Sequence, residues 1–319
     1  MSLDNGHYAY YPGCSLQATA KSYDTSTKRV GEILGLKFEE VADWNCCGAT
    51  EYFSLNSLPA YSLVARNLSL ASQQDTAELV APCSACYLNL HKTDKYMGQH
   101  GDLNAEVNQA LAAGGLHYDP GSLRIRHLLD VVVEDVGYEA IAEKIVQPLK
   151  GLRVAPYYGC LLVRPDSGYN QEYPTHLDEL LRTLGATVVD FPLKTHCCGG
   201  HMTQISEETA FELQRRILHN ATEYEADIIV TICPMCQLNL DAYQPSVNRM
   251  FGTAFNLPVL FFTQVMGLAF GLPADEVGIG SEIVSARPAL GKIGQEEEPA
   301  VRKPQRRDKK ALPMPTPHS

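Results

Sequence analysis

Several motifs that would point to a common cofactor are missing from this chain of 319 residues. No Gly-x-Gly-x-x-Gly motif follows an expected strand, and no Gly-Lys-Ser/Thr phosphate loop occurs, so nothing supports a flavin, nicotinamide or nucleotide site. The closely spaced four-cysteine run of bacterial ferredoxins is also absent. Electrons for any redox chemistry would therefore have to arrive from another protein.

Long apolar segments are missing as well. The longest, residues 257–273, is interrupted by Thr263 and Gln264 and is short for a membrane span. The N-terminus has no basic stretch followed by an apolar one, as a signal peptide would have. We therefore expect no membrane span and a cytoplasmic location, where structural disulfides are rare.

Basic residues are scarce outside the C-terminal tail. The net charge is −11, but residues 287–319 hold eight Lys or Arg against four Asp or Glu, so the preceding body carries −15. A body of that charge repels nucleic acid phosphates, which excludes nucleic acid as a partner. We expect the charged, proline-rich tail at 286–319 to be disordered; the alternative is a docking peptide for an acidic partner surface.

The most informative feature is the cysteine pattern, because all ten cysteines fall into two copies of one pattern of five. Corresponding cysteines lie 146 to 151 residues apart, which indicates a duplicated module. The first copy is Cys14, Cys46, Cys47, Cys83 and Cys86, and the second is Cys160, Cys197, Cys198, Cys233 and Cys236.

The halves also share other sequence. TyrProGlyCys at 11–14 matches TyrTyrGlyCys at 157–160, and CysSerAlaCysTyrLeuAsnLeu at 83–90 matches CysProMetCysGlnLeuAsnLeu at 233–240. A repeat of this length is a duplicated domain rather than a short solenoid unit. We therefore predict a first module at 1–148, a second at 149–285, and the tail at 286–319.

Short extended runs alternate with helical stretches in both copies. In the second copy we expect strands at 153–158, 187–191, 227–232 and 258–262, with helices near 172–184 and 206–222 and after Cys233. The first copy ends with a strand at 124–128 and a helix near 129–146. This alternation predicts an α/β fold: two βαβ-type halves with parallel sheets, related by a pseudo-twofold axis.

Four cysteines, Cys14, Cys83, Cys160 and Cys233, come directly after expected strands. In parallel sheets, ligands bind beyond the carboxyl ends of the strands. Each set of five can therefore gather at one edge, and soft thiolates gathered in this way favour a metal.

Four kinds of bond remain open for these cysteines. Disulfides conflict with the compartment, and adjacent cysteines rarely bridge each other. Structural zinc takes four ligands and would leave one cysteine unused in each copy. The remaining two are a four-cysteine iron–sulfur cube with a spare thiol and a larger iron–sulfur cluster that uses all five thiolates; we favour the last.

The doubled Cys–x31–CysCysGly–x35–Cys-x-x-Cys pattern resembles the CCG domain of the heterodisulfide reductase B subunit, over residues 8–270. The resemblance implies that each five-cysteine set binds a non-cubane [4Fe–4S] cluster, and that the two clusters face each other across a cleft. It also implies two partner proteins of a heterodisulfide reductase-type complex, one ferredoxin-like and one flavin-containing.

The chemistry that this resemblance implies is reduction, or reversible formation, of a disulfide substrate. Splitting a disulfide into two thiols takes two electrons, and two facing clusters can supply one each and each capture one sulfur. One alternative is an electron-transfer iron–sulfur subunit of a glycolate or lactate oxidase or succinate:quinone reductase type of complex. The other is a zinc-stapled scaffold without redox activity.

Other groups beside the cysteines are candidates for supporting roles. His196 and His201 flank the second CysCysGly and are candidate proton donors, as is Lys194 more weakly; the alternative is that they are ordinary loop residues. The first copy has Trp44 and Asn45 in place of a histidine, so such a role would not be symmetric. We expect Trp44 to pack in the core or shield the cluster. Gly48 and Gly199 are expected to permit tight turns.

Overall fold

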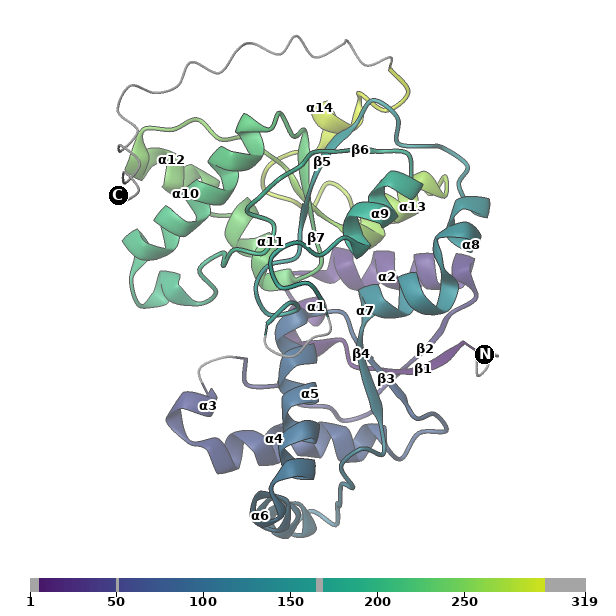
Figure 1. Cartoon of the computed structure of the whole chain (residues 1–319), viewed down its shortest axis with the longest axis vertical. Coiled ribbons are helices and arrows are strands. Elements are labelled where there is room, and N and C mark those ends of the chain that lie inside the picture. Colours follow the sequence, from purple (N-terminus) through teal and green to yellow (C-terminus); the bar gives the residue numbers. More distant parts are fainter. Residues whose placement is uncertain (1–5, 50–51, 165–168, 296–319) are drawn as a thin grey trace, which may run out of the picture.

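The structure is a computed structural model that describes residues 6–49, 52–164 and 169–295. Within them the chain forms two four-stranded parallel sheets with helices packed around them (Figure 1). The predicted α/β class with two duplicated halves is confirmed.

The first half contains one sheet and the helices that connect its strands. Its elements are β1 His7–Tyr10, α1 Gly13–Gln17, α2 Lys21–Leu34, β2 Lys37–Glu40, α3 Tyr52–Leu55, α4 Ser57–Ala71, β3 Glu78–Ala81, α5 Ser84–Gln99, α6 Gly101–Ala112, β4 Arg124–His127, α7 Leu128–Asp130, the π-helix η1 Val131–Val136 and α8 Tyr138–Glu143.

The second half repeats this plan. Its elements are β5 Arg153–Tyr157, α9 His176–Thr183, β6 Thr187–Val188, the 3-10 helix η2 Met202–Gln204, α10 Glu207–Glu223, β7 Ile228–Thr231, α11 Pro234–Asp241, α12 Gln244–Phe251, β8 Val259–Phe261, α13 Phe262–Ala269 and α14 Arg287–Leu290.

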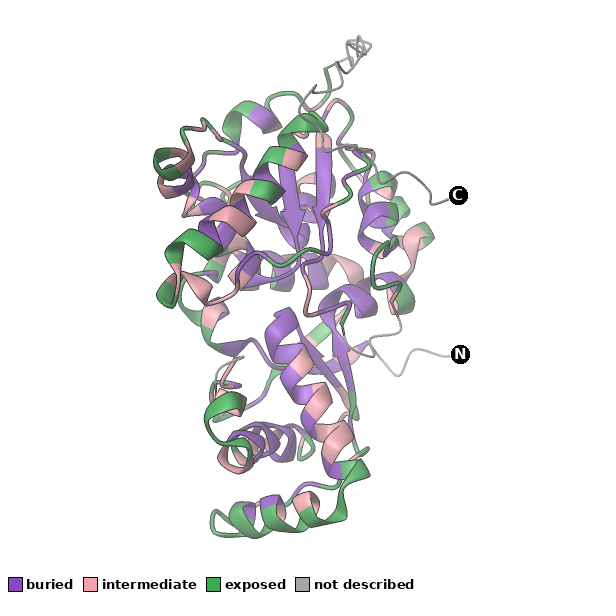
Figure 2. Cartoon of the chain, turned by 60° about the vertical axis from the view of Figure 1, so that its left-hand side comes forward, coloured by how far each residue is buried: buried purple, intermediate pink, exposed green. Residues whose placement is uncertain are grey.

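Both sheets have the same strand order, β2-β1-β3-β4 and β6-β5-β7-β8. In the first, Ala9 pairs with Leu79 between β1 and β3; in the second, Ala155 pairs with Ile229 between β5 and β7. In each sheet the strand order reverses between the two middle strands, β1 and β3 in the first and β5 and β7 in the second. In parallel sheets, ligands bind beyond the carboxyl ends of the strands at this reversal. The inner strands β1, β3, β5 and β7 are mostly buried, and Figure 2 shows buried strands with helices around them, whereas the edge strand β2 is mostly exposed.

One expected helix differs in the structure. The single helix near 129–146 is divided into α7, the π-helix η1 and α8. Val131, Val132 and Val133 are consecutive and all buried, whereas Glu134 is exposed, a pattern that lacks the spacing of an amphipathic α-helix. β-branched side chains also fit an α-helix poorly.

The two halves contact each other through α2 of the first half and through the segment before α9 of the second. The Tyr23 ring on α2 stacks on Phe261 at the end of β8, with ring centroids 4.2 Å apart, and Ser26 Oγ lies 2.6 Å from Thr263 Oγ1 on α13. In return, the Tyr169 hydroxyl of the second half donates to Asp130 of the first. The hydrophobic core is continuous through both halves.

The prediction that the whole tail at 286–319 is disordered is wrong for residues 286–295. Residues 286–295 include α14, Ala286 is fully buried, and the Gly294 N–H donates to Lys150 O at 2.8 Å. The small apolar side chains at 286 and 289 allow this segment to pack on the second half. Residues 296–319, the rest of the expected tail, lie outside the described residues.

No helix in the described part of the chain combines the length and apolar character needed to cross a bilayer.

Candidate metal centre

The fold brings the cysteines of each half to the carboxyl edge of its sheet. Cys14 and Cys160 follow the middle strands β1 and β5, and Cys83 and Cys233 follow the middle strands β3 and β7. The CysCysGly loops come after β2 and β6. The expectation that strand ends gather each set is therefore met by the topology.

The thiols within each set lie close together. The Sγ atoms of Cys14 and Cys46 are 3.7 Å apart, those of Cys47 and Cys86 are 3.4 Å apart, and those of Cys198 and Cys236 are 3.5 Å apart. Two sulfurs bound to one tetrahedral metal at about 2.3 Å would be about 3.8 Å apart. These separations fit soft donors that share metal atoms.

The five thiols of each set are soft donors of the kind that bind iron–sulfur clusters or zinc. Within residues 6–49, 52–164 and 169–295, no group of three or more His, Cys, Asp or Glu side chains is arranged around one point.

Neighbouring thiols also favour ionisation of one member of a pair. The Cys160 thiol donates to Cys197, and with help from the Gly199 N–H this lowers the pKa of Cys197 to about 6. A hydrogen bond from Cys14 lowers the pKa of Cys46 to about 2. The thiolate is the form that binds metal, so each half holds a thiolate ready for coordination.

Two tyrosines that we did not single out from the sequence hold the CysCysGly loops. The Tyr11 hydroxyl donates to Asn45 O at 2.6 Å, and the Tyr157 hydroxyl donates to His196 O at 2.5 Å. Each of these carbonyls belongs to the residue just before the adjacent cysteines. Both tyrosines lie in the repeated Tyr-x-Gly-Cys string, so the duplication could have identified them from the sequence.

Asparagines hold the other side of the same loops. Asn89 Nδ2 donates to Cys47 O at 3.0 Å and to Ala49 O. Asn239 Nδ2 donates to Gly200 O at 2.8 Å and lies 3.4 Å from both Cys198 O and Cys198 Sγ. Both asparagines lie in the repeated Cys-x-x-Cys-x-x-Asn-Leu string, so the duplication could have identified them.

Glycines permit the close approach of backbone to sulfur. Gly48 and Gly199 have φ of +74° and +98°, as the expected tight turns require. Gly13 and Gly159 are more constrained, because a Cβ there would lie 2.8 Å from Cys86 Sγ and 2.9 Å from Cys236 Sγ. Only glycine fits at these two positions.

The two sets meet at the interface between the halves. The loops of Cys83 and Cys233 lie side by side, because the Tyr23 hydroxyl is 3.1 Å from Pro82 O and 3.2 Å from Ile232 O. The neighbouring Cys233 raises the pKa of the Cys83 thiol. The imidazole of His201 in the second half is close enough to Cys46 in the first half to help lower the pKa of that thiol. The five-cysteine sets are therefore neighbours across the interface.

The other sequence candidates separate into different environments. His196 is exposed, whereas His201 lines a cavity beside the second set. Lys194 is only 2% exposed, and its ammonium contacts Asp178 at 3.0 Å and Pro174 O at 2.7 Å. These contacts give Lys194 a structural role in anchoring its loop and do not support proton donation. Trp44 packs against Tyr11, as expected for a shielding ring.

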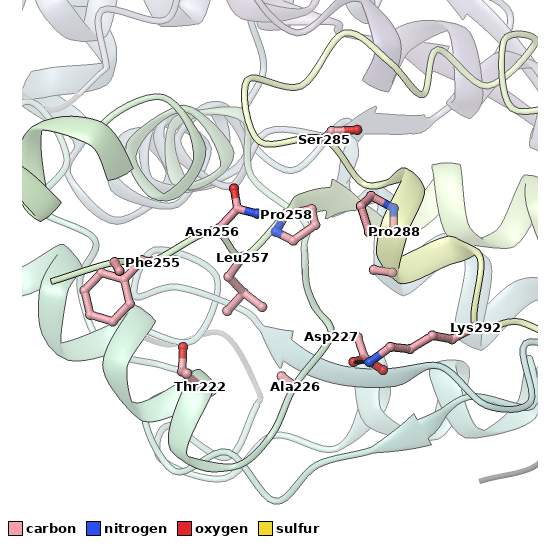
Figure 3. A pocket seen from close by; sticks show the side chains of 12 residues that line it. Thr222, Ala226, Asp227, Phe255, Asn256, Leu257, Pro258, Ser285, Pro288 and Lys292 are labelled. Atoms are coloured by element: carbon pink, nitrogen blue, oxygen red, sulfur yellow. Dashed lines mark hydrogen bonds and ion pairs between the residues drawn. The ribbon is translucent and has the colours of Figure 1, made fainter. Parts of the chain in front are cut away.

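The cavity beside the second set has a volume of about 220 Å³. All five second-set cysteines line it, together with Ser84 of the first half and the apolar side chains of Leu161, Met202, Ile205 and Met235. No Lys, Arg, Asp or Glu among the described residues lines it. A larger cavity of about 380 Å³ lies at the amino ends of β7 and β8, where Lys292 pairs with Asp227 (Figure 3), and has no cysteine in its lining.

Comparison with known proteins identifies a cysteine-rich domain in each half. The model of the cysteine-rich domain family CCG matches residues 8–91 and 154–241, one match in each half. The 8-methylmenaquinol:fumarate reductase membrane anchor subunit of Wolinella succinogenes is 34% identical over 88% of this chain and 97% of its own length. The B subunit of the ferredoxin:CoB-CoM heterodisulfide reductase of Methanosarcina mazei is 30% identical over 88% of this chain and 95% of its own length.

One solved structure supports the fold alone. A hypothetical protein from Helicobacter pylori superimposes with a TM-score of 0.73 at 15% identity, over 89% of this chain and 53% of that one. The doubled family match and the full-length relatives settle the assignment: the chain belongs to the CCG cysteine-rich domain family, with the B subunits of heterodisulfide reductases among its relatives.

Proposed function

We propose that this protein is the catalytic subunit of a heterodisulfide reductase-like complex, reducing or reversibly forming a disulfide at two facing iron–sulfur sites. The observation that carries the proposal is that the Cys83 and Cys233 loops meet: the carbonyls just before these cysteines, Pro82 O and Ile232 O, lie 3.1 Å and 3.2 Å from one hydroxyl, that of Tyr23. The two five-cysteine sets are therefore neighbours. A substrate with two sulfur atoms at its reacting bond suits a pair of adjacent one-electron sites.

All ten cysteines are the proposed ligands of two non-cubane [4Fe–4S] clusters, five to each. When bound, the clusters would supply one electron each to the disulfide and a site for each sulfur. Overall, one disulfide takes up two electrons and two protons, the sulfur–sulfur bond breaks, and two thiols leave. The protein itself holds the thiolates at the interface between the halves and supplies protons there.

His201 is the stronger of the two proposed proton donors. It lines the cavity beside the second set and lies near Cys46 of the first, so its imidazole can reach a substrate between them. His196 is exposed, and its carbonyl is held by Tyr157. We therefore keep His196 as a candidate with a smaller role.

Electrons would come from partner proteins, because the sequence offers no flavin or nucleotide motif. We propose that a ferredoxin-like protein is the direct donor and that a flavin-containing protein supplies it, in a cytoplasmic complex. Cys14, Cys46 and Cys197 are exposed, which provides places where a partner can approach the sites.

A second candidate is a role in electron transfer within a quinol-linked complex. Two observations favour it: the 34% identity to a component of 8-methylmenaquinol:fumarate reductase, and the cavity lining of Leu161, Met202, Ile205 and Met235. An apolar wall without a formal charge suits a neutral, ring-shaped quinone as well as a neutral disulfide.

The deciding experiment is anaerobic purification with the accompanying proteins of the complex, followed by reduction and challenge with different oxidants. If a disulfide reoxidises the reduced protein and yields two thiols, the first proposal holds. Reoxidation by a water-soluble quinone, with no response to any disulfide in a panel of neutral and anionic members, favours the second. A colourless preparation free of iron and sulfide contradicts both.

A further inference from the structure

Two buried side chains, Tyr23 and His127, connect the cysteine-bearing loops of the two halves. Tyr23 lies on α2 and His127 ends β4, so both belong to the first half, and both are fully buried. The loops that they connect are those of Cys83 and Cys233, which lie side by side at the interface.

The Tyr23 hydroxyl contacts one backbone carbonyl from each half. It lies 3.1 Å from Pro82 O and 3.2 Å from Ile232 O, and its single proton is shared between them. These two carbonyls belong to the residues just before Cys83 and Cys233. Tyr23 is kept in place by its stacking on Phe261.

His127 faces the same two carbonyls. Its Nδ1 accepts a hydrogen bond from the Leu129 N–H at 3.1 Å, which leaves the ring proton on Nε2. Nε2 lies 3.5 Å from Ser84 Oγ. Burial lowers the pKa of His127, and the carbonyls of Pro82 and Ile232 are near enough to the ring to oppose that shift. Tyr23 and His127 thus both lie beside these carbonyls in a buried site, where an unpaired carbonyl is costly.

The connection acts on the backbone and not on the sulfur atoms. The Tyr23 hydroxyl contacts the carbonyls that precede Cys83 and Cys233, so it can hold the two loops together whatever the thiols bind.

We propose that Tyr23 and His127 are positioning residues that fix the separation of the two cysteine sets, and so govern how strongly the clusters interact. The inference rests on the proposed function, because it requires two filled sets. It adds residues that touch neither substrate nor metal but determine the distance between the two sites.

The chain contains a matched control. Tyr169 lies 146 residues after Tyr23, the same offset that separates Cys14 and Cys160. Its hydroxyl also crosses between the halves, but it donates to the Asp130 side chain rather than to a cysteine-bearing loop. Tyr169→Phe therefore removes an inter-half hydrogen bond without touching the proposed connection.

The test compares Tyr23→Phe, the double variant Tyr23→Phe/His127→Phe, and Tyr169→Phe in the intact complex. The readout is the magnetic interaction between the two reduced clusters in electron paramagnetic resonance, with iron and sulfide content measured on the same samples. Dipolar interaction falls with the inverse cube of distance, so a small separation of the loops is visible. We expect weaker interaction in Tyr23→Phe, weaker still in the double variant, and the wild-type value in Tyr169→Phe, at equal iron content.

Unchanged interaction in the Tyr23→Phe protein with both sets filled would overturn the inference, and so would an equal weakening in Tyr169→Phe. If the double variant does not fold, the two single variants decide the question between them. Failure of the proposed function looks different, since wild-type protein would then show a single cluster, no iron, or two clusters without interaction.

Discussion

The two CysCysGly loops have the same cysteines but different surroundings. In the first half, Arg66 and Asn67 bind the loop from outside: the Arg66 guanidinium donates to Asp43, and Asn67 Oδ1 accepts from Asn45 N at 2.8 Å. In the second half, the loop is anchored through the buried pair of Lys194 and Asp178.

The loops also differ in what they leave open. The second is followed by Gly200 and His201 and borders the cavity of about 220 Å³. The first is followed by Ala49, a non-glycine residue at a φ of +45°. The comparison teaches that duplication preserved the cysteines. Among the residues that the structure describes, which leave out 50 and 51 beside the first loop, the second half combines a histidine with an apolar recess. We therefore propose that substrate contacts lie mainly in the second half.

The strongest way to break this comparison is to remove the adjacent cysteines of one half at a time. Cys197→Ser/Cys198→Ser should lose the second cluster and abolish disulfide reduction, because two adjacent electron donors are needed. The first cluster's spectrum should persist. Cys46→Ser/Cys47→Ser is the matched variant and should do the reverse. Full disulfide reductase activity in either would contradict the paired-site account.

The glycines that touch sulfur should be nearly as sensitive. Gly159→Ala places a Cβ 2.9 Å from Cys236 Sγ at a φ of +67°, so we expect most iron to be lost from the second set only. Gly13→Ala should do the same to the first set. The control is Gly252→Ala, with a φ of +65° and no atom within 4 Å, which tests the backbone strain alone. Iron content per chain, together with the spectrum of the remaining cluster, checks the result.

The two histidines sharpen the difference between the halves. His201→Gln should lower the rate of disulfide reduction by roughly 10²-fold, the lower end for loss of a general acid, with both clusters still present. His196→Gln should have a smaller effect, because that side chain is exposed. Single-turnover rates at a fixed pH provide the measurement. A larger loss in the His196 variant would reverse the assignment.

The smallest expected effect is at the asparagines. Asn89→Leu or Asn239→Leu removes donors from buried loop carbonyls, which should lower the free energy of unfolding by about 1–3 kcal/mol. Asn239 also lies 3.4 Å from Cys198 Sγ. Its variant should therefore lower the reduction potential of the second cluster as well, since a donor near sulfur stabilises the added electron. Equal shifts in both variants would remove this distinction.

Much of the site could be predicted from the sequence because the information is local. A strand such as 228–231 is wholly buried, and the cysteines that follow it must lie at the carboxyl edge of a parallel sheet. The same duplication that revealed the cysteines carried Asn89 and Asn239. The predicted disorder is wrong for residues 286–295, which pack on the second half. Lys194, a weak candidate whose alternative was an ordinary loop residue, pairs with Asp178, a partner that sequence proximity could not identify.

The contact between the two sets could not be predicted from the residues alone. It depends on the packing of α2 against α13 and the end of β8, which brings Tyr23 onto Phe261 from more than two hundred residues away in sequence. The groups that Tyr23 contacts are backbone carbonyls, which have no sequence signature. Only the assembled halves reveal them.

The central claim, that both cysteine sets act together on one sulfur–sulfur bond, is tested most directly by titration. The anaerobic complex is reduced and a disulfide is added stepwise while the spectra of both clusters are followed. The account predicts that the two clusters are reoxidised in parallel, with two electrons and two product thiols for each disulfide. Reoxidation of one cluster while the other stays reduced would contradict it.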